Sequence, residues 1–382
     1  MKLTSSTAGR TVRQMPDIST FLQGHAAQPS ILVDTAAVIA FCRDLCDWAE
    51  AAHTVAPLRV TRRVADTNFE IATTMADHAA LCVERLGHTG KARSDAAPVR
   101  LVIASAGELG FAQTPMVGRG VSSMQALEEA LVSTPFSAHH HPETRFWQVW
   151  DRDRRIGVQL QAAPGTLPAW EAGSPLRNLV KWALSTADVG LLHAGTLAVD
   201  GRGFLFAGKG GAGKSGTVIS GLRGGLESVG DDYVLARLTP DSVRVMPVFQ
   251  TLKCDMAGLK RLGLLERDGL VSGKANWQGK YEFTFAQLTG APAAPALRID
   301  GLCATVLAHT PSTRFEPISH REAFIALAPT GVAQLPSDRG AHFSLCARIS
   351  RALPCFRLHL GTDPVEVASA IRFQITKVSP TC

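Results

Sequence analysis

The sequence predicts a mixed α/β protein with two domains, a smaller α+β domain over residues 1–165 and a larger α/β domain over residues 166–382. Three observations support this prediction. Short apolar runs suited to strands alternate with segments of helical periodicity. The stretch 163–168 is rich in proline and glycine and is typical of a linker. In the second half, a glycine-rich loop stands between an apolar run and a helix, an arrangement that α/β folds use repeatedly.

Composition indicates a globular chain without a nucleic-acid signature. The 382 residues are 46% hydrophobic, which is enough for two or three substantial cores. The formal net charge is +6. Lysines and arginines are scattered along the chain and do not form one stripe with aromatic residues between them, so nucleic acid is not expected as a partner. We interpret the positive excess as a solvated face, which would also attract an acidic partner.

The first residues predict neither export nor a membrane span. Residues 1–10 lack the apolar core of a signal peptide. The apolar stretch 31–42 is interrupted by Asp34 and is too short to cross a bilayer, so no membrane partner is expected. The eight cysteines show no C-x-x-C spacing, which predicts reduced, buried thiols and a cytoplasmic protein. Cys42 and Cys46 share one face of a predicted helix, but two thiolates alone do not make a zinc site.

The elements of the first domain follow from hydrophobic periodicity. In chain order we expect helices over 35–52 and 69–86, a strand over 98–104, a loop over 107–120, a helix over 123–133, and a β-hairpin formed by 145–150 and 154–161. Residues His139, His140 and His141 are consecutive. Because consecutive side chains point in different directions on any regular element, we do not expect a metal site there.

The second domain is predicted to begin with a helix capped by Ser174, with Pro175 in its first turn. Residues 190–199 and 204–207 are predicted as antiparallel strands joined by the turn 200–203, so the glycine-rich loop leaves a hairpin. Such loops ordinarily follow a strand of a parallel sheet, and the departure requires an explanation. The remaining predictions are helices over 214–222, 257–262, 321–327, 343–352 and 364–371 and strands over 226–238, 246–248, 297–307 and 356–360.

The glycine-rich loop matches a phosphate-binding template. Residues 208–215 fit G-x-x-x-x-G-K-[ST] at every fixed position. Glycines let successive backbone N–H groups point into one concavity, and the N-terminus of the following helix adds the positive end of its dipole. Lys214 would then reach the β and γ phosphates of a nucleotide, and the Ser215 hydroxyl would ligate Mg²⁺. The predicted nucleotide-binding residues are Gly208, Lys209, Gly210, Gly211, Ala212, Gly213, Lys214, Ser215 and Gly216.

An acidic pair and a histidine could supply the remaining groups for phosphoryl transfer. Asp231 and Asp232 precede the apolar run 233–235. Two adjacent carboxylates can divide the work, one held on Mg²⁺ and the other free to take a proton from an attacking hydroxyl. His193 is expected on the strand that pairs with the one feeding the loop, where it would orient the neighbouring carboxylate or share its proton. Taken singly, the pair could equally form a solvated turn, and the histidine could be a core residue.

The order of these features resembles a known family. The series His193, turn 200–203, glycine-rich loop, Asp231–Asp232 is similar to the C-terminal catalytic domain of HPr kinase/phosphorylase and its HPr-kinase-like serine kinase relatives, closely over 186–240 and loosely beyond. The resemblance implies a fold similar to phosphoenolpyruvate carboxykinase, which would explain the hairpin. It also implies that Lys214 and Ser215 hold nucleotide and Mg²⁺, that Asp231 is the general base beside His193, and that Asp232 ligates the metal.

Departures from the family pattern shape the expected substrate. The arginine-containing stretch with which HPr kinases recognise HPr has only a weak counterpart in Arg298–Gly301, so HPr is not the expected acceptor. Residues 170–177 look more like HPr-kinase-like proteins, some of which phosphorylate a serine of a peptide natural product such as a lasso peptide. Lys209 adds a second cation to the loop, and Lys253 and Arg298 are candidate clamps on the transferred phosphoryl group.

The sequence therefore predicts a cytoplasmic kinase that transfers the γ-phosphoryl group of ATP or GTP, with Mg²⁺, to a serine hydroxyl of a peptide or protein. The first domain would recognise the partner or substrate, and the family's habit suggests a homo-oligomer. Two alternatives stay open, a kinase for a small-molecule alcohol and a nucleotide-gated binding module without chemistry. The acidic pair disfavours the module, because a pure sensor needs no spare carboxylate.

Overall fold

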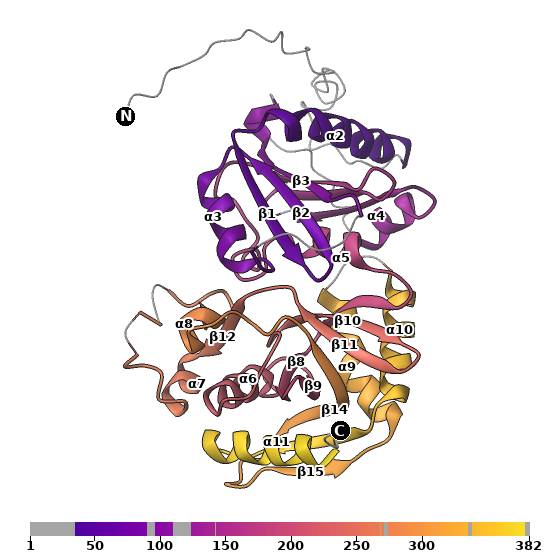
Figure 1. The fold of residues 1–382 in the computed structure, drawn as a ribbon. Helices are drawn as coiled ribbons and strands as arrows, with labels where there is room; N and C mark the ends of the chain where they lie inside the picture. Colours follow the sequence, from indigo (N-terminus) through magenta and orange to yellow (C-terminus); the bar gives the residue numbers. More distant parts are fainter. Residues whose placement is uncertain are drawn as a thin grey trace.

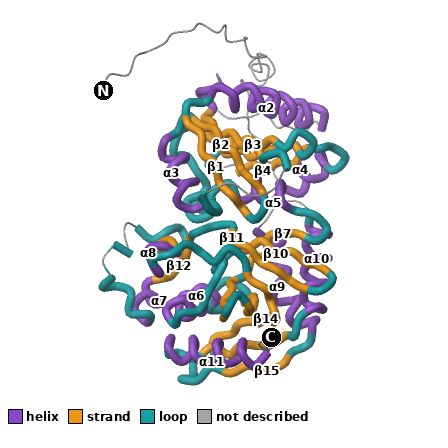
Figure 2. Tube along the Cα trace, viewed as in Figure 1, coloured by secondary structure: helices purple, strands orange, loops and turns teal. Residues whose placement is uncertain are grey.

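The computed structural model describes residues 35–89, 96–109, 124–141, 143–267, 269–270, 274–334 and 338–378. The chain is mixed α/β and forms two large sheets and one small one. Figure 1 shows the indigo-to-magenta elements around the first sheet above the rose-to-yellow elements around the second. Figure 2, in the same view, shows the strands of both sheets flanked by helices.

The first sheet has six strands in the order β1-β2-β3-β6-β5-β4. Strands β2, β3 and β6 at its centre are parallel, and antiparallel pairs complete both edges. Helix α2 packs against β3, β5 and β6 and buries Phe41 and Leu45 on Trp147 and its neighbours. The elements are α2 (Thr35–Val55), β1 (Leu58–Val64), β2 (Thr67–Thr73), α3 (Ala76–Arg85), β3 (Val99–Ser105), α4 (Met124–Leu131), β4 (Phe136–His141), β5 (Phe146–Asp151) and β6 (Ile156–Gln161).

Sequence and structure agree on most of these elements. The helix expected over 35–52 and the expected hairpin are confirmed by α2 and by the β5–β6 pair. The helix expected over 69–86 is wrong in its first half, which forms β2. Because β1 and β3 pair with β2 on either side and its Phe69 and Ile71 are buried, tertiary contacts override the local helical spacing. Of the loop expected over 107–120, only 107–109 are described, within a short 3-10 helix.

The second sheet is organised by the long strand β14 (Leu297–Leu307). On one side β14 runs parallel to β9 (Arg202–Ala207), and on the other it pairs first with β11 and then with β16. The path of the sheet is β15-β16-β14-β11-β10-β7, and the β8–β9 hairpin joins it at β14. The other strands are β7 (Val189–His193), β8 (Gly195–Val199), β10 (Tyr233–Thr239), β11 (Ser242–Pro247), β15 (Arg314–Pro317) and β16 (Cys355–Leu360).

Helices pack on the second sheet through two separate apolar clusters. Helices α6 and α11 pack on each other and share one cluster, whereas α9 and α10 belong to the other. A further cluster contains Trp150 of the first large sheet, Leu235 of the second and Leu179 of α5, so apolar side chains join the two halves. The remaining elements are α5 (Arg177–Leu184), α6 (Lys214–Arg223), β12 (Thr251–Asp255), α7 (Met256–Arg261), β13 (Lys280–Thr284), α8 (Phe285–Thr289), α9 (His320–Gln334), α10 (Arg339–Ala352) and α11 (Pro364–Val378).

The region before the glycine-rich loop differs from expectation in two ways. The strand expected over 190–199 is broken at Ala194, because β7 pairs with β10 whereas β8 pairs with β9. The hairpin that leads into the loop is confirmed. Its strand β9 is also parallel to β14, so the loop still follows a strand of a parallel pair, as such loops ordinarily do. Ser174 does not cap α5, which begins at Arg177. Leu176 has φ 59° there, and its N–H donates to the buried Glu171 carboxylate at 2.8 Å.

All seven cysteines in the described part of the chain are buried, and none of them forms a disulfide. Cys382 lies outside the described residues. Among the helices that the structure describes, none combines the length and the apolar character needed to cross a membrane. The cytoplasmic location and the division at residue 165 stay predictions.

We expect Gly203→Ala to destabilise the second sheet. A Cβ at this position would lie 2.0 Å from the Leu197 carbonyl oxygen and 2.7 Å from the Ala198 Cβ, across the β8–β9 pair. The free energy of unfolding, measured by urea denaturation, should fall by about 1–3 kcal/mol. The control Gly340→Ala, whose Cβ would meet nothing within 4 Å, should leave it unchanged or raise it by up to about 1 kcal/mol. Equal stabilities for the two variants would contradict the close approach.

Candidate active site

The glycine-rich loop connects the end of β9 to the start of α6 with a backbone that side chains would not tolerate. Gly208, Gly211 and Gly213 have φ values of 151°, 78° and 95°. A Cβ on Gly208 would lie 2.9 Å from the Thr305 hydroxyl, and one on Gly213 would lie 2.5 Å from Leu360. The loop is therefore glycine-rich for two reasons, the left-handed backbone and the close approach of the strand ends below it.

Lys214 is the first residue of α6 and its ammonium group turns back onto the loop. Its Nζ donates to the carbonyl oxygens of Gly208 at 2.6 Å and Lys209 at 3.3 Å, and the side chain is buried. Burial lowers the pKa of Lys214, and nearby Lys280 lowers it further, whereas Asp231 and Asp232 raise it. The lysine thus lies within the electrostatic reach of both acidic residues, as the sequence predicts. The side chain of Lys209 is exposed.

Asp231 is a buried carboxyl group just before β10. Its Oδ2 accepts the backbone N–H of Lys253 at 3.2 Å, and no described residue offers a hydrogen bond to its Oδ1. Burial and the charge of Asp232 raise the pKa of Asp231 to about 6, although Lys253 and the Ser215 hydroxyl act to lower it. The group is therefore close to Ser215 and is poised to gain or lose a proton near neutral pH.

Asp232 has the opposite electrostatic environment. Its Oδ2 lies 2.9 Å from Lys253 Nζ, and its Oδ1 lies 2.9 Å from His193 Nε2. Burial acts to raise the pKa of Asp232, but the charge of Lys253 and the hydrogen bond to His193 hold it well below its usual range. Asp232 is therefore kept as a carboxylate, whereas its neighbour Asp231 takes up a proton near pH 6.

His193 reaches the site by a route that differs from the expected one. It lies on β7, opposite Tyr233 of β10, and the ring centroids are 5.4 Å apart. The expectation that its strand pairs with β9 is wrong. The strand is interrupted at Ala194, and only its second part, β8, forms the hairpin with β9. The sequence predicts a place beside Asp231, and the structure shows a direct contact between the His193 ring and the adjacent Asp232. Among the described residues, its buried Nδ1 has no hydrogen-bond partner.

The two candidate clamps have different outcomes. Lys253 lies in the site but is bound to Asp232. Arg298 is remote, because it stands opposite Arg202 at the start of β9 whereas the loop follows Ala207 at its end. At about 3.3 Å per residue the two ends of β9 are about 16 Å apart. Arg298 pairs with Asp300 at 3.3 Å, so it and the Arg298–Gly301 stretch take no part in this site.

Supporting residues that the sequence did not reveal connect the site to the first half of the chain. On β13, Glu282 stands opposite Lys253 and accepts from Arg85 of α3 at 3.0 Å. Gly173 is packed so closely that a Cβ would lie 2.7 Å from Glu282 Oε1 and 2.8 Å from Lys253 Cε. No motif marks Arg85 or Glu282, because nearly two hundred residues separate them in the sequence.

Arg177 contacts Tyr233, the residue whose ring packs on His193. Arg177 donates to the Tyr233 hydroxyl at 2.9 Å, and its guanidinium lies 5.1 Å from the Tyr233 ring and 5.5 Å from the Trp170 ring. Tyr233 in turn packs on His193. The region 170–177, noted in the sequence for its resemblance, therefore contacts Tyr233, which directly follows the acidic pair in the chain.

The three consecutive histidines lie on β4, and His139 and His141 contact the Trp170 ring. His140 packs on Trp147 with ring centroids 4.5 Å apart, and His141 meets Trp170 edge-on. Burial lowers the pKa of His139 to about 3 and of His140 to about 4, so both rings are neutral. Among the described residues, no cluster of three or more histidine, cysteine or acidic side chains is arranged for a metal ion.

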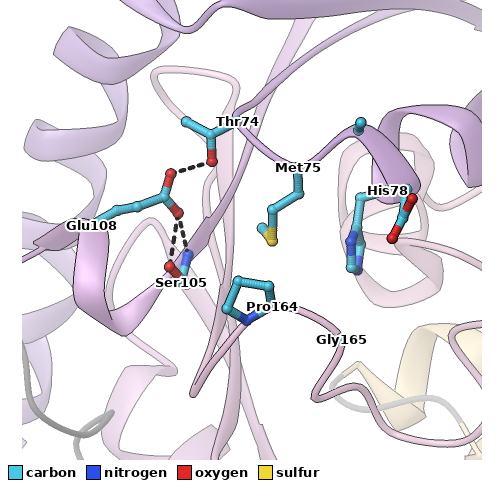
Figure 3. Close-up of a pocket in the computed structure, with 9 residues that line it drawn as sticks. Thr74, Met75, His78, Ser105, Glu108, Pro164 and Gly165 are labelled. Carbon is cyan, nitrogen blue, oxygen red and sulfur yellow. Dashed lines mark hydrogen bonds between the residues drawn. The ribbon is translucent and has the colours of Figure 1, made fainter.

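A hollow of about 500 Å³ lies in the first half of the chain, where β2, β3 and β6 end (Figure 3). Figure 3 shows Glu108 turned toward Ser105 and Thr74. Its carboxylate accepts the Ser105 backbone N–H at 2.6 Å, the Ser105 hydroxyl at 3.0 Å and the Thr74 hydroxyl. None of the predicted site residues lines this hollow, so size alone does not mark the phosphate site.

Comparison with known proteins adds little to this geometry. No protein-family model matches the chain, and no curated protein matches its sequence. Among solved structures, the chain is similar to the HPr(Ser) kinase/phosphatase from Coxiella burnetii, with 14% sequence identity and a TM-score of 0.27, over 49% of this chain and 97% of that one. A likeness this weak supports no conclusion about activity, and membership of the HPr-kinase-like family stays a prediction.

We expect Asp231→Asn to change how stability depends on pH. The pKa of Asp231 is about 6 in the folded chain and 3.8 is its ordinary value, so between these values the folded state binds more protons than the unfolded state. The contribution of Asp231 to stability therefore falls as pH rises through this window. Because Asn cannot ionise, the variant should gain up to about 3 kcal/mol relative to wild type between pH 4 and pH 7.

Urea denaturation at several pH values measures this difference. The matched control is Asp241→Asn, in the exposed turn between β10 and β11. If the stability difference between Asp231→Asn and wild type were the same at every pH, the assignment of an elevated pKa to Asp231 would be refuted.

Proposed function

We propose that the protein is a phosphotransferase that moves the γ-phosphoryl group of ATP or GTP to an alcohol, with a serine of a peptide or protein as the acceptor. The observation that carries the proposal is the convergence at one loop of Lys214, Ser215 and two carboxyl groups with unlike ionisation. A binding module needs the loop and the lysine, but it has no use for a buried carboxyl group with a pKa of about 6.

In the proposed reaction the phosphates lie on the backbone N–H groups of the loop and at the N-terminus of α6. Lys214 leaves its loop carbonyls for the β and γ phosphate oxygens. The acceptor oxygen bonds to the γ phosphorus as the bond to the β–γ bridging oxygen breaks, and the hydroxyl proton passes to Asp231. The products are the nucleoside diphosphate and a phosphoester. A pKa of about 6 suits this base, because it is largely ionised at neutral pH and still binds a proton well.

The residues present fit a magnesium ion. The oxygen donors are the Ser215 hydroxyl, the Asp232 carboxylate, which stays ionised, and the unpartnered Oδ1 of Asp231. We propose Ser215 and Asp232 as its ligands, with His193 and Lys253 fixing Asp232 from the side. When bound, Mg²⁺ would neutralise charge on the transferred phosphoryl group.

The serine acceptor follows from the resemblance to HPr-kinase-like proteins. Incubation with Mg²⁺, γ-labelled ATP and serine-containing peptides, followed by mass spectrometry, would locate the label. Label on a peptide serine supports the proposal, and label only on a small alcohol would replace the acceptor class. ATP binding without transfer to any hydroxyl would overturn the kinase in favour of a binding module.

We expect the two central substitutions to separate binding from chemistry. Lys214→Ala should abolish transfer and weaken nucleotide binding, because the cation at the β and γ phosphates is lost. Asp231→Asn should keep nucleotide affinity within about threefold and reduce kcat by about 10²- to 10⁴-fold. Asp241→Asn serves as the exposed control. An Asp231→Asn enzyme with normal kcat would show that another group takes the proton.

A further inference from the structure

A shallow groove adjoins the phosphate loop on the side of α7 and α11. It encloses about 60 Å³ and is lined by α6, α7, the ends of β14 and β16, and the start of α11. Gly213 and Gly216 belong both to this lining and to the predicted nucleotide-binding residues. The groove is therefore continuous with the surface on which the phosphates are proposed to lie.

The topology of the sheet brings the groove to that place. Strands β9, β14 and β16 are mutually parallel neighbours in that order. The phosphate loop follows β9, and Leu307 and Leu360, the last residues of β14 and β16, line the groove. In open α/β sheets, ligands bind beyond the carboxyl ends of parallel strands. A ligand held by its phosphates at the first of these ends would extend over the next two.

The lining suits a ring with an apolar face. Leu262, Leu307, Leu360 and Val367 supply hydrocarbon. The hydroxyls of Thr217 and Ser220 also line the groove, but they donate to the Gly213 and Gly216 carbonyl oxygens at 2.9 Å and 2.7 Å, so their protons are already used.

Gly216 leaves space at the groove, and Arg261 adds a positive charge to its lining. A Cβ added to Gly216 would meet nothing within 4 Å, so the helix surface is open where a nucleotide would leave the loop. Arg261, an exposed residue at the end of α7, also lines the groove. A guanidinium plane stacks on aromatic rings and pairs with phosphate oxygens.

We propose that this groove holds the nucleoside of the nucleotide whose phosphates lie on the loop. The inference rests on the proposed function, since it needs a nucleotide on the loop. Trp277 offers the competing location, because it is 64% exposed in the turn before β13, and Lys280 at the start of β13 lowers the pKa of Lys214. The groove is favoured because it shares Gly213 and Gly216 with the loop.

The test compares ATP with inorganic tripolyphosphate, which has the phosphates and no nucleoside. With Mg²⁺ present, calorimetry should show that the wild-type protein binds ATP at least about tenfold more tightly. Gly216→Leu places a side chain in the groove, and leucine favours a helix more than glycine does, so α6 should persist. This variant should reduce the advantage of ATP over tripolyphosphate to about twofold, and the ratio of the two affinities is the readout because Gly216 also belongs to the predicted nucleotide-binding residues. Arg261→Ala should reduce the same advantage, and Trp277→Ala should not.

Each outcome decides between the ideas. An advantage of ATP that survives both Gly216→Leu and Arg261→Ala overturns the groove, as does its loss in Trp277→Ala alone. Equal wild-type affinity for ATP and tripolyphosphate also overturns it, while leaving the phosphate site intact. If neither compound binds to the wild-type protein, the proposed function fails and the groove fails with it.

Discussion

The charge distribution of this site depends on Lys253, which makes different contacts with the adjacent acids Asp231 and Asp232. Lys253 gives its backbone N–H to Asp231 and its ammonium group to Asp232. Burial and the charge of Asp232 raise the pKa of Asp231 more than Lys253 lowers it, whereas the ammonium group of Lys253 and the His193 ring hold the pKa of Asp232 low. Two neighbouring carboxyl groups that would otherwise behave alike therefore separate, one as a fixed anion and the other as a group that exchanges a proton near pH 6. The proposed base and the proposed magnesium ligand can then coexist beside the glycine-rich loop.

The residues of this site come from segments that are far apart in the sequence. The β7–β10 pair places His193 beside Asp232, the small β12–β13 sheet holds Lys253, and the β9–β14 pair sets the loop. The first half of the chain also contributes, because Arg85 pairs with Glu282 opposite Lys253 and the apolar cluster around Trp150 spans both large sheets.

Local signals in the sequence were sufficient for some features and insufficient for others. The loop, the helix after it, the hairpin before it and the acidic pair are contiguous patterns, and all of them were predictable. The break at Ala194 was not, because only the pairing of β7 with β10 and β8 with β9 forces it. That break decides which acid His193 meets. The strand β2 was mistaken for helix for a similar reason, since its two neighbours along the sheet determine it. Arg85, Gly173 and Glu282 carry no local signal, and Arg298 lost its candidate role once the strand register was known.

The unequal ionisation of the two acids can be measured directly in the free protein. Carbon-13 NMR of aspartate-labelled protein, with Asp231→Asn and Asp232→Asn used to assign the signals, follows each carboxyl group through a pH titration. We predict that one carboxyl titrates near pH 6 and is Asp231, and that Asp232 stays ionised well below the ordinary aspartate range. Two carboxyl groups that titrate together near pH 4, the ordinary range for aspartate, would contradict the account.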